Sequence, residues 1–355
     1  MGCAGKMTRI DIKSLSKAAL QDELGKMGEP SYRARQIFKW LYRAGVRHFD
    51  DMTDISVDLR HAIKERFHIT RLVVSDTKRS ALDGTTKYLF RLEDGNTIET
   101  VFLPEKDRST ICLSSQVGCK FACSFCASAP FGFMRNLKQS EILDEVLWAA
   151  EGSRHAPITN LVFMGIGEPF DNYENVLGAI RIFNDKDAFM IGARKITIST
   201  CGIIPGIEKL KKEGLQVELS VSLHAADDGI RSKLLPINKR YPIREVIRSC
   251  REYTSDTNRV VTFEYILLKG VNSSKEDAVK LADILKGMKC KVNVIYYNRI
   301  ALKKYQPPSN EDAVLFINTL EGRGINVTLR KSKGEDIDAG CGQLRITKMA
   351  DRDGR

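Results

Sequence analysis

Three cysteines near the middle of the chain have a spacing that suits metal binding. Cys119, Cys123 and Cys126 form a CxxxCxxC pattern, with Phe125 directly before the last thiol. Cysteine thiolates are the usual ligands of iron-sulfur clusters, and a [4Fe-4S] cluster normally takes four of them. A loop with only three thiolates leaves one iron of such a cluster open to a different ligand. The pattern therefore predicts a [4Fe-4S] cluster with one open coordination site.

Two other interpretations of these thiols stay open at this point. The loop could belong to a structural zinc site, with Cys112 or a histidine as the fourth ligand. The three thiols could also be unrelated buried side chains. Zinc motifs usually pair two CxxC units, and the sequence contains only one, Cys123 with Cys126. The spacing therefore favours the cluster.

The composition predicts a globular cytoplasmic protein with free thiols. The chain has 355 residues, 43% hydrophobic and 28% charged, which is typical of two domains with an ample core. It carries nine cysteines, and its sequence has neither a signal peptide nor an apolar run long enough to span a membrane. These features argue against a disulfide-stapled secreted protein and against a membrane protein.

The charge and the first 75 residues point to a nucleic-acid partner. A formal net charge of +11 favours a polyanion, although it is also compatible with ordinary basic solubility. Residues 1–75 have apolar positions at helical spacing and are expected to form a helical RNA-binding domain. A solvated helix face over an aromatic core is an equally good interpretation of its basic and aromatic side chains. These are Arg33, Arg35, Lys39, Arg43, Arg47 and His48, interleaved with Tyr32, Trp40 and Tyr42.

Residues 76–104 are expected to form a β-hairpin adaptor around an Asp-Gly turn. Strand alternation places Glu99 on the apolar face of its strand. Burial there would raise the pKa of the carboxyl group and suit it to proton transfer. The competing interpretation is a salt bridge from Glu99 to Lys87 or Arg91.

Residues 105–336 alternate short β-branched runs with longer amphipathic segments, which predicts an α/β domain with a parallel sheet. Helices are expected at 139–151, 172–184 and 276–288, and a last strand at 326–330 would close or extend the sheet. Six strands make a partial (β/α)6 barrel the expected architecture. They are 110–113, 159–164, 195–199, 217–223, 260–267 and 291–296.

Chemistry in such folds lies on loops that leave the carboxyl ends of the strands. The cysteine loop follows the first predicted strand, and residues 165–169 follow the second, with glycines that let a ligand approach the backbone. Polar side chains end or follow three further strands. Each alone is more typical of a cap or a turn, but their shared edge predicts a binding site. They are Ser199, Ser222, His224 and Asn298.

The last segment, residues 337–355, carries a thiol between two glycines, Cys341. A loop of this kind can bring a side chain to the edge of the sheet. A lone cysteine in a loop is usually incidental, so the residues alone make Cys341 only a candidate nucleophile.

Six segments together resemble the RlmN/Cfr family of radical S-adenosylmethionine enzymes, which methylate adenosine in RNA. The resemblance covers nearly the whole chain and implies a helical RNA-binding domain joined to a radical S-adenosylmethionine barrel. In the RlmN branch the target is carbon 2 of an adenosine in 23S rRNA, with tRNA as a further substrate. The segments are 32–36, 114–119, 132–137, 164–169, 222–225, and 336–338 with 341–344.

The resemblance also implies a role for each site residue. The three loop cysteines would hold the cluster, whose open iron takes the amino and carboxylate groups of S-adenosylmethionine. Cys341 would take a methyl group from one S-adenosylmethionine, and a second would give a 5'-deoxyadenosyl radical, so each turnover uses two. Cys112 would release the product by forming a disulfide with Cys341, and Glu99 would act as the acid/base carboxylate. Contacts to S-adenosylmethionine would come from Gly167, Glu168, Ser199, Ser222, Leu223, His224 and Asn298.

Partners and alternatives follow from the same resemblance. The expected partners are 23S rRNA, tRNA and an electron donor such as flavodoxin or ferredoxin, and the expected state is a monomer. One alternative is the Cfr-type enzyme, which methylates carbon 8 and confers resistance to ribosome-targeting antibiotics. A different class would be a non-catalytic metal-containing RNA-binding protein, which leaves Glu99, Cys112 and Cys341 without roles.

Overall fold

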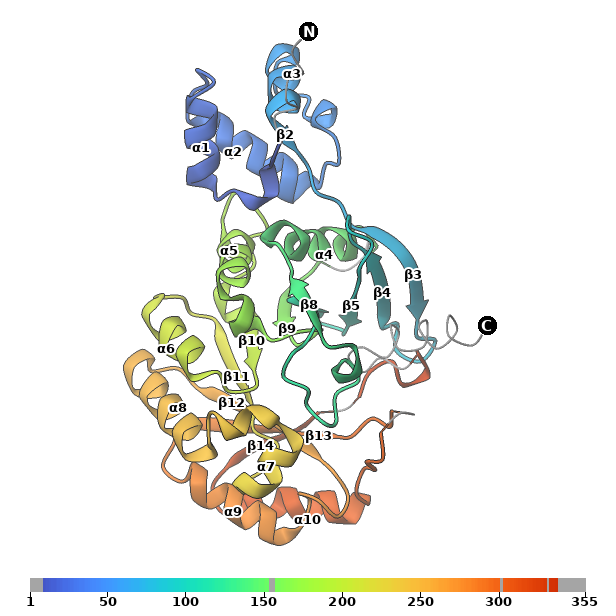
Figure 1. Ribbon diagram of the computed structural model, residues 1–355, viewed down its shortest axis with the longest axis vertical. Helices are drawn as coiled ribbons and strands as arrows, with labels where there is room; N and C mark the ends of the chain where they lie inside the picture. The colour runs from blue at the N-terminus through green and yellow to red at the C-terminus, as the bar shows by residue number, and fades with distance from the viewer. Residues whose placement is uncertain (1–8, 153–156, 301–302, 331, 338–355) are drawn as a thin grey trace.

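The computed structural model describes residues 9–152, 157–300, 303–330 and 332–337. Ten strands make one central sheet, with helices packed along it (Figure 1). The strands are β3 (Val73–Arg79), β4 (Thr86–Arg91), β5 (Thr97–Pro104), β6 (Ser109–Cys112), β9 (Asn160–Phe163), β10 (Ile196–Thr200), β11 (Glu218–Ser222), β12 (Val261–Leu267), β13 (Cys290–Tyr296) and β14 (Asn326–Arg330). Their order across the sheet is β14-β13-β12-β11-β10-β9-β6-β5-β4-β3.

The predicted α/β core is confirmed. Strand β6 and strands β9 to β14 pair in parallel, and each predicted strand is present. Because β14 stands at the end of the strand order, it extends the sheet as a seventh parallel strand and does not close a barrel. The helices of the core are α4 (Gln139–Gly152), α5 (Tyr173–Asn184), α6 (Ile204–Lys212), α7 (Asp228–Leu234), α8 (Ile243–Thr257), α9 (Lys275–Leu285) and α10 (Asn310–Glu321). None of the helices in the described ranges is long and apolar enough to cross a membrane.

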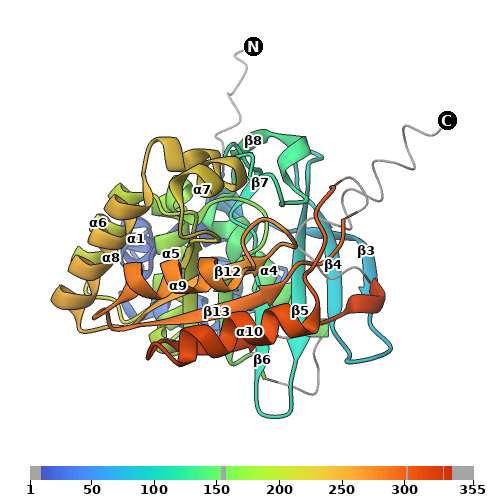
Figure 2. The same ribbon diagram turned by 90° about the horizontal axis from the view of Figure 1, so that it is seen from below.

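Three antiparallel strands continue this sheet beyond β6. The predicted hairpin is β4 with β5, and β5 pairs with β6. The sequence gives little indication of β3, because its side chains alternate only between exposed and half-buried positions and most of them are polar. The hairpin therefore shares one sheet with the parallel strands, which fixes its side chains relative to theirs (Figure 2).

The N-terminal part is helical, as its periodicity predicts. It contains α1 (Lys17–Gly25), α2 (Tyr32–Lys39) and α3 (Val57–Arg66), and a short parallel pair of β1 (Ile10–Asp11) and β2 (Phe67–His68). The apolar side chains Ile37, Phe38 and Ile63 are fully buried between these helices. In Figure 1 this blue unit stands above α4 and α5.

A buried ion pair joins the N-terminal helices to the core. The ammonium group of Lys13 pairs with the Asp144 carboxylate of α4, and both side chains are less than 10% exposed. The second oxygen of Asp144 accepts a hydrogen bond from the backbone N–H of Leu72 at 2.6 Å. This carboxylate therefore fixes both the first turn of the N-terminal unit and the segment that leads from it to β3.

The contact between the N-terminal part and the core also covers some of the basic and aromatic side chains that the sequence suggested for RNA binding. Tyr42 is buried, with only 3% of its surface exposed. Arg47 pairs with Glu151 of α4, and Arg43 donates a hydrogen bond to the backbone carbonyl of Lys186. These three side chains therefore lie against the core.

We expect the Lys13 to Asp144 pair to be a major stabilising contact between the two parts. Lys13→Met leaves a buried carboxylate without its cation, which costs about 3–5 kcal/mol of unfolding free energy. The control Lys64→Met removes a surface pair with Asp50 and should cost at most about 1 kcal/mol. Urea titrations measure both losses. Equal losses in the two variants would contradict the assignment.

Candidate functional site

A cavity of about 410 Å³ lies at the carboxyl ends of the parallel strands. It is the edge at which parallel α/β sheets carry their chemistry. Most of the predicted site residues line it, although they come from six separate segments of the chain. They are Cys112, Cys119, Cys123, Cys126, Gly167, Glu168, Ser199, Ser222, His224 and Asn298. The sheet therefore brings together the residues that the sequence pattern placed at one edge.

The cysteine loop is held at its base by a small antiparallel ribbon, β7 (Gln116–Gly118) with β8 (Phe133–Asn136). The backbone N–H of Cys119 donates to the carbonyl of Gly132 at 2.7 Å. Gly118 has a φ of +74°, and a Cβ atom there would lie 1.8 Å from the same carbonyl. Only glycine fits at this close approach of the two backbones. The first cysteine is therefore fixed where the two strands of the ribbon meet.

The environment of the three thiols fits a metal cluster. Burial raises the pKa of Cys119 to about 12 and raises that of Cys123 as well, and the neighbouring thiols add to both shifts. Cys119 and Cys123 are therefore neutral on their own, and a metal must displace their protons to bind. Within the described ranges, no group of three or more His, Cys, Asp or Glu side chains could hold a single metal ion. Three thiols spread around one cavity suit a cluster in which each thiolate binds its own iron.

Two glycines after β9 allow the turn to pack against the base of the cysteine loop. A Cβ atom on Gly165 would lie 2.6 Å from the carbonyl oxygen of Leu113. Gly167 has a φ of +105°, and a Cβ atom there would lie 2.6 Å from the Cβ atom of Gln116. The sequence pattern suggested that these glycines admit a ligand. The structure adds a different reason, because the chain's own backbone approaches them.

Glu168 joins this turn to the end of the next strand. One carboxylate oxygen accepts the backbone N–H of Phe170 at 3.0 Å, and the other accepts that of Cys201 at 2.7 Å. Burial raises the pKa of Glu168, although these hydrogen bonds act in the opposite direction. The side chains of Thr200 and Cys201 also bond to this carboxylate, so the fold fixes Glu168 firmly at the wall of the cavity.

His224 is held as a neutral ring. Its Nδ1 accepts the backbone N–H of Ile266 at 3.1 Å, which places the ring proton on Nε2. Burial, helped by the charge of Arg231, lowers the pKa of His224 to about 3. The residue has a φ of +57°, and its ring stands edge-on to Phe125 with the ring centroids 4.8 Å apart. His224 is therefore a fixed hydrogen-bond donor beside the cysteine loop.

The strand register places Glu99 and Cys112 on the same face of the sheet. Cys112 pairs with Val101, and Glu99 lies two residues before Val101 on β5. Cys112 lines the cavity, whereas Glu99 is only 3% exposed and is not one of the lining residues. Lys87, which the sequence offered as an ion-pair partner, is fully buried on the same face, because it pairs with Val101 across β4 and β5.

Besides Glu99, two further predicted residues are not among the side chains that line this cavity in the described ranges. Leu223 is fully buried in the core, so only its backbone is available to a ligand. Its carbonyl already accepts a hydrogen bond from Arg231. Cys341 lies outside the described residues. The chain before it is tethered near the β3–β4 turn, where the backbone N–H of Gly334 donates to Asp83 at 2.9 Å.

Several polar residues of the cavity wall were missed. The Glu264 carboxylate accepts hydrogen bonds from Ser220 at 2.8 Å and from Asn293 at 2.9 Å. Its second oxygen lies 3.6 Å from a guanidinium nitrogen of Arg330 and has no hydrogen-bond partner in the described chain. The hydroxyl of Tyr297 is also buried without such a partner. The signal for Glu264 was available, because Thr262 and Glu264 alternate with apolar residues on β12.

Comparisons with known proteins agree with this geometry. The model of the radical SAM superfamily matches residues 113–282, and that of the ribosomal RNA large subunit methyltransferase N-terminal domain matches residues 10–69. The chain is 45% identical over 342 residues to a probable dual-specificity RNA methyltransferase RlmN of Thermoanaerobacter sp. (strain X514), covering 96% of this chain and 99% of that protein. It is 44% identical to the corresponding Bacillus cereus (strain B4264) protein, covering 96% and 94%.

A solved structure is similar over the same length. The crystal structure of a radical SAM methyltransferase from Sphaerobacter thermophilus superposes with a TM-score of 0.90 at 44% identity. The match covers 94% of this chain and 98% of that one. Both the N-terminal helices and the ten-stranded sheet therefore have counterparts in known proteins.

We expect Cys123→Ala to abolish binding of the iron-sulfur cluster. The control is Cys250→Ala, which removes a fully buried thiol from α8 outside the cavity. After anaerobic reconstitution, iron content and visible absorption should be lost in the first variant and retained in the second. Full iron binding by Cys123→Ala, or stoichiometric zinc in place of iron, would contradict the assignment.

Proposed function

Because this chain belongs to the RlmN family of radical S-adenosylmethionine RNA methyltransferases, we propose that it methylates carbon 2 of an adenosine in 23S rRNA and in tRNA. The observation that carries the proposal is one cavity that gathers the cysteine loop, Cys112 and the glycine turn. The name of the relatives, dual-specificity RNA methyltransferase, supports two kinds of RNA substrate. The N-terminal helices are the proposed RNA-binding part.

The chemistry of the target explains why a radical route is needed. Carbon 2 of adenine lies between two ring nitrogens and is electron-poor. It therefore cannot attack the electrophilic methyl group of S-adenosylmethionine directly. A carbon-centred radical can add to such a position.

We assign the residues as follows. Cys119, Cys123 and Cys126 hold the [4Fe-4S] cluster, which when bound supplies the electron that cleaves S-adenosylmethionine to a 5'-deoxyadenosyl radical. Residues at the carboxyl ends of the parallel strands hold S-adenosylmethionine through backbone and side-chain hydrogen bonds. They are Gly167, Glu168, Ser199, Ser222, His224 and Asn298, with the backbone of Leu223. The neutral His224 ring offers only a donor on Nε2, which suits an acceptor atom of the ligand.

Two cysteines share the methyl transfer in this proposal. Cys341 takes a methyl group by displacement from a first S-adenosylmethionine, so a turnover uses two molecules of it. Hydrogen abstraction from that methyl group gives the carbon radical that adds to adenine and links the RNA to Cys341. The adduct must then lose one electron, which the oxidised cluster would take back, and one ring proton, for which Glu99 acts as the acid/base carboxylate. The Cys112 thiolate then attacks the sulfur of Cys341: the disulfide bond forms as the bond from that sulfur to the transferred carbon breaks, and this carbon takes a proton to become the methyl group of the product.

Two features of the structure support this division of labour. Cys112 lines the cavity beside the cysteine loop, which suits a thiol that must reach the reacting centre. Lys333 lines the same cavity, and the chain is held at Ile337 in the last described turn. Four more residues lead to Cys341, and four residues of chain span at most about 14 Å. The proposal therefore requires that these four residues lead back toward the cavity.

The first experiment identifies the product. RNA modified by the anaerobically reconstituted enzyme should yield 2-methyladenosine on digestion and mass spectrometry. Rather than 2-methyladenosine, a Cfr-type enzyme would give 8-methyladenosine, and this result would reject the carbon 2 assignment. Separate assays with 23S rRNA and tRNA test the two substrates, with flavodoxin and ferredoxin compared as the proposed electron donors.

The second experiment tests Cys112. Cys112→Ala keeps the methyl carrier and the radical source but lacks the releasing thiol, so a covalent RNA adduct on Cys341 should accumulate. Cys290→Ala, which removes a half-buried thiol from β13, should turn over normally. Peptide mapping after nuclease digestion locates the adduct. Normal turnover by Cys112→Ala, or an adduct at another residue, would show that the mechanism is wrong for this chain.

A further inference from the structure

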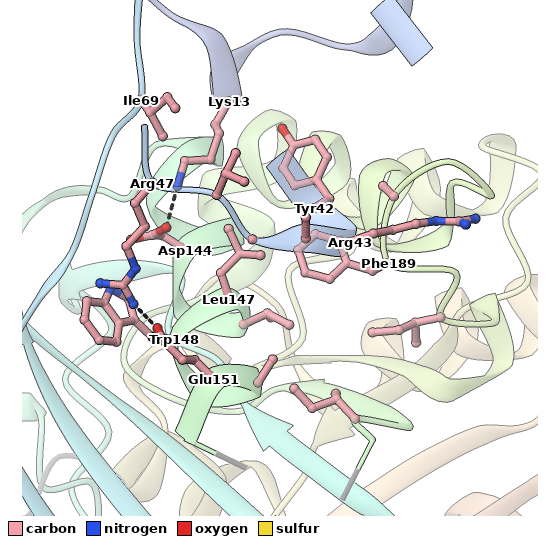
Figure 3. A pocket seen from close by; sticks show the side chains of 18 of the residues that line it. Lys13, Tyr42, Arg43, Arg47, Ile69, Asp144, Leu147, Trp148, Glu151 and Phe189 are labelled. Atoms are coloured by element: carbon pink, nitrogen blue, oxygen red, sulfur yellow. Dashed lines mark hydrogen bonds and ion pairs between the residues drawn. The ribbon is translucent and has the colours of Figure 1, made fainter. Parts of the chain in front are cut away.

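A second cavity, of about 610 Å³, lies between the N-terminal helices and the core. It shares no lining residue with the cavity beside the cysteine loop, which we call the reactive cavity. Its walls come from the end of the α2 region, from the segment that leads to β3, from the second half of α4 and from the residues that precede β10. Figure 3 shows it, with Tyr42 and Phe189 facing each other on one side and Arg47 and Trp148 on the other. We call it the seam pocket.

The lining of the seam pocket carries an excess of positive charge. Lys13 is neutralised by Asp144, and Arg47 is neutralised by Glu151. Two more cations, Arg43 and Arg71, line the pocket without a carboxylate of their own among its lining residues. Four cations against two carboxylates leave an excess of two positive charges. Such an excess in a partly enclosed space attracts an anion.

Arg71 is the residue that most clearly lacks a partner. One of its terminal guanidinium nitrogens is buried and has no hydrogen-bond partner in the described chain. Burial lowers the pKa of Arg71, and the nearby charge of Arg47 lowers it further. Asp144 attracts Arg71 but is already paired with Lys13. A buried donor without an acceptor is costly, so this position favours a ligand that supplies one.

A second unpartnered group lines the same pocket. The hydroxyl of Tyr42 is buried and makes no hydrogen bond within the described chain. The residue is 3% exposed, and its ring is fixed against Phe38 and Phe189. A phenol at neutral pH can donate its proton to an anionic oxygen. The pocket thus offers two unused donors from two different segments.

Arg47 is positioned before any ligand arrives. Its guanidinium lies over the Trp148 ring, 3.6 Å from the ring centroid. The indole N–H donates to the backbone carbonyl of Leu72 at 2.9 Å, so the ring itself is fixed. Leu72 directly follows Arg71 in the chain. The same contacts therefore hold both arginines, and pre-organised arginines suit phosphate oxygens.

We propose that the seam pocket is a phosphate-binding site in which Arg71 and Tyr42 donate to the phosphate oxygens and Arg47, already positioned by Trp148 and Glu151, offers a further guanidinium donor. The ligand chemistry could come from an RNA backbone phosphate or from free phosphate. The RNA-modifying activity of the family favours RNA. The proposal is independent of which adenine carbon is methylated. A phosphate held here by both parts of the chain links RNA binding to their relative position.

The test compares Arg71→Met with Arg108→Met. Arg108 lies in the exposed β5–β6 turn and pairs with Glu105, so both variants lose one positive charge. In the first arm, RNA affinity is measured by fluorescence anisotropy over a range of salt concentrations. Loss of one phosphate contact should reduce the slope of log affinity against log salt by about 0.7 to 0.9 in Arg71→Met only.

The second arm uses free phosphate without RNA. The unfolding midpoints of the wild-type protein and of Arg108→Met should both be higher in phosphate than in chloride at equal ionic strength, because phosphate binding adds an extra shift to the general salting effect. Arg71→Met should lose this extra shift. A change in the first arm identifies RNA as the source, and a change only in the second identifies free phosphate. If Arg71→Met matches Arg108→Met in both arms, the proposal is overturned.

A milder variant covers the case in which Arg71→Met does not fold. Tyr42→Phe removes only a hydroxyl that has no partner in the described chain. Its unfolding midpoint in chloride should equal or exceed that of the wild type, because no hydrogen bond is lost. Its extra shift in phosphate should be smaller than that of the wild type. An undiminished shift, with an RNA salt slope equal to that of the wild type, would exclude the hydroxyl and overturn the site as drawn.

Discussion

The arrangement of the reactive cavity depends on the buried side-chain amide of Gln116. Its oxygen accepts the backbone N–H of Glu168 at 2.9 Å, and its nitrogen donates to the side chains of Asn136 and Asp171, each at 2.8 Å. The amide thus joins the base of the cysteine loop, its return strand β8 and the turn after β9. Because Gln116 is fully buried, each of these hydrogen bonds is protected from water and expensive to lose. The glycine at 167 is needed because this side chain occupies the space beside it.

The sequence predicted the parallel core because its strands are short, β-branched and bounded by amphipathic helices, and such signals are local. It also placed the rim residues at one edge, since that placement follows from strand polarity alone. The amide network of Gln116 could not be derived in this way, because its partners are 20 and 55 residues away. The strand β3 and the ribbon of β7 with β8 were missed for a related reason. Their residues are polar or few, and long-range pairing makes them strands.

One face of the parallel sheet carries polar side chains that packing of the core alone does not require. Ser220, Glu264 and Asn293 are neighbours across three parallel strands, on positions that the register turns to the same face. Apolar residues there would pack without unsatisfied groups. Instead, Glu264 keeps one oxygen without a hydrogen-bond partner in the described chain, at the wall of the cavity. A polar group that the fold leaves unsatisfied in a cavity is a sign of ligand contact rather than of packing.

The two cavities use different physical principles, and the connection between them constrains how a large substrate is held. The reactive cavity is built on strand ends, where rigid hydrogen bonds fix the thiols and the ring of His224. The seam pocket is built between parts of the chain that meet through charged side chains, such as Lys13 with Asp144. Helix α4 runs between them, because Asp144 and Glu151 face the seam while Glu145 accepts the backbone N–H of Ser114 at the start of the cysteine loop region. A shift of the N-terminal helices is therefore opposed by the same helix that supports the reactive edge. In the proposed function, an RNA that contacts both parts must accept their preset separation, so binding to the N-terminal helices and alignment of the target base become one event.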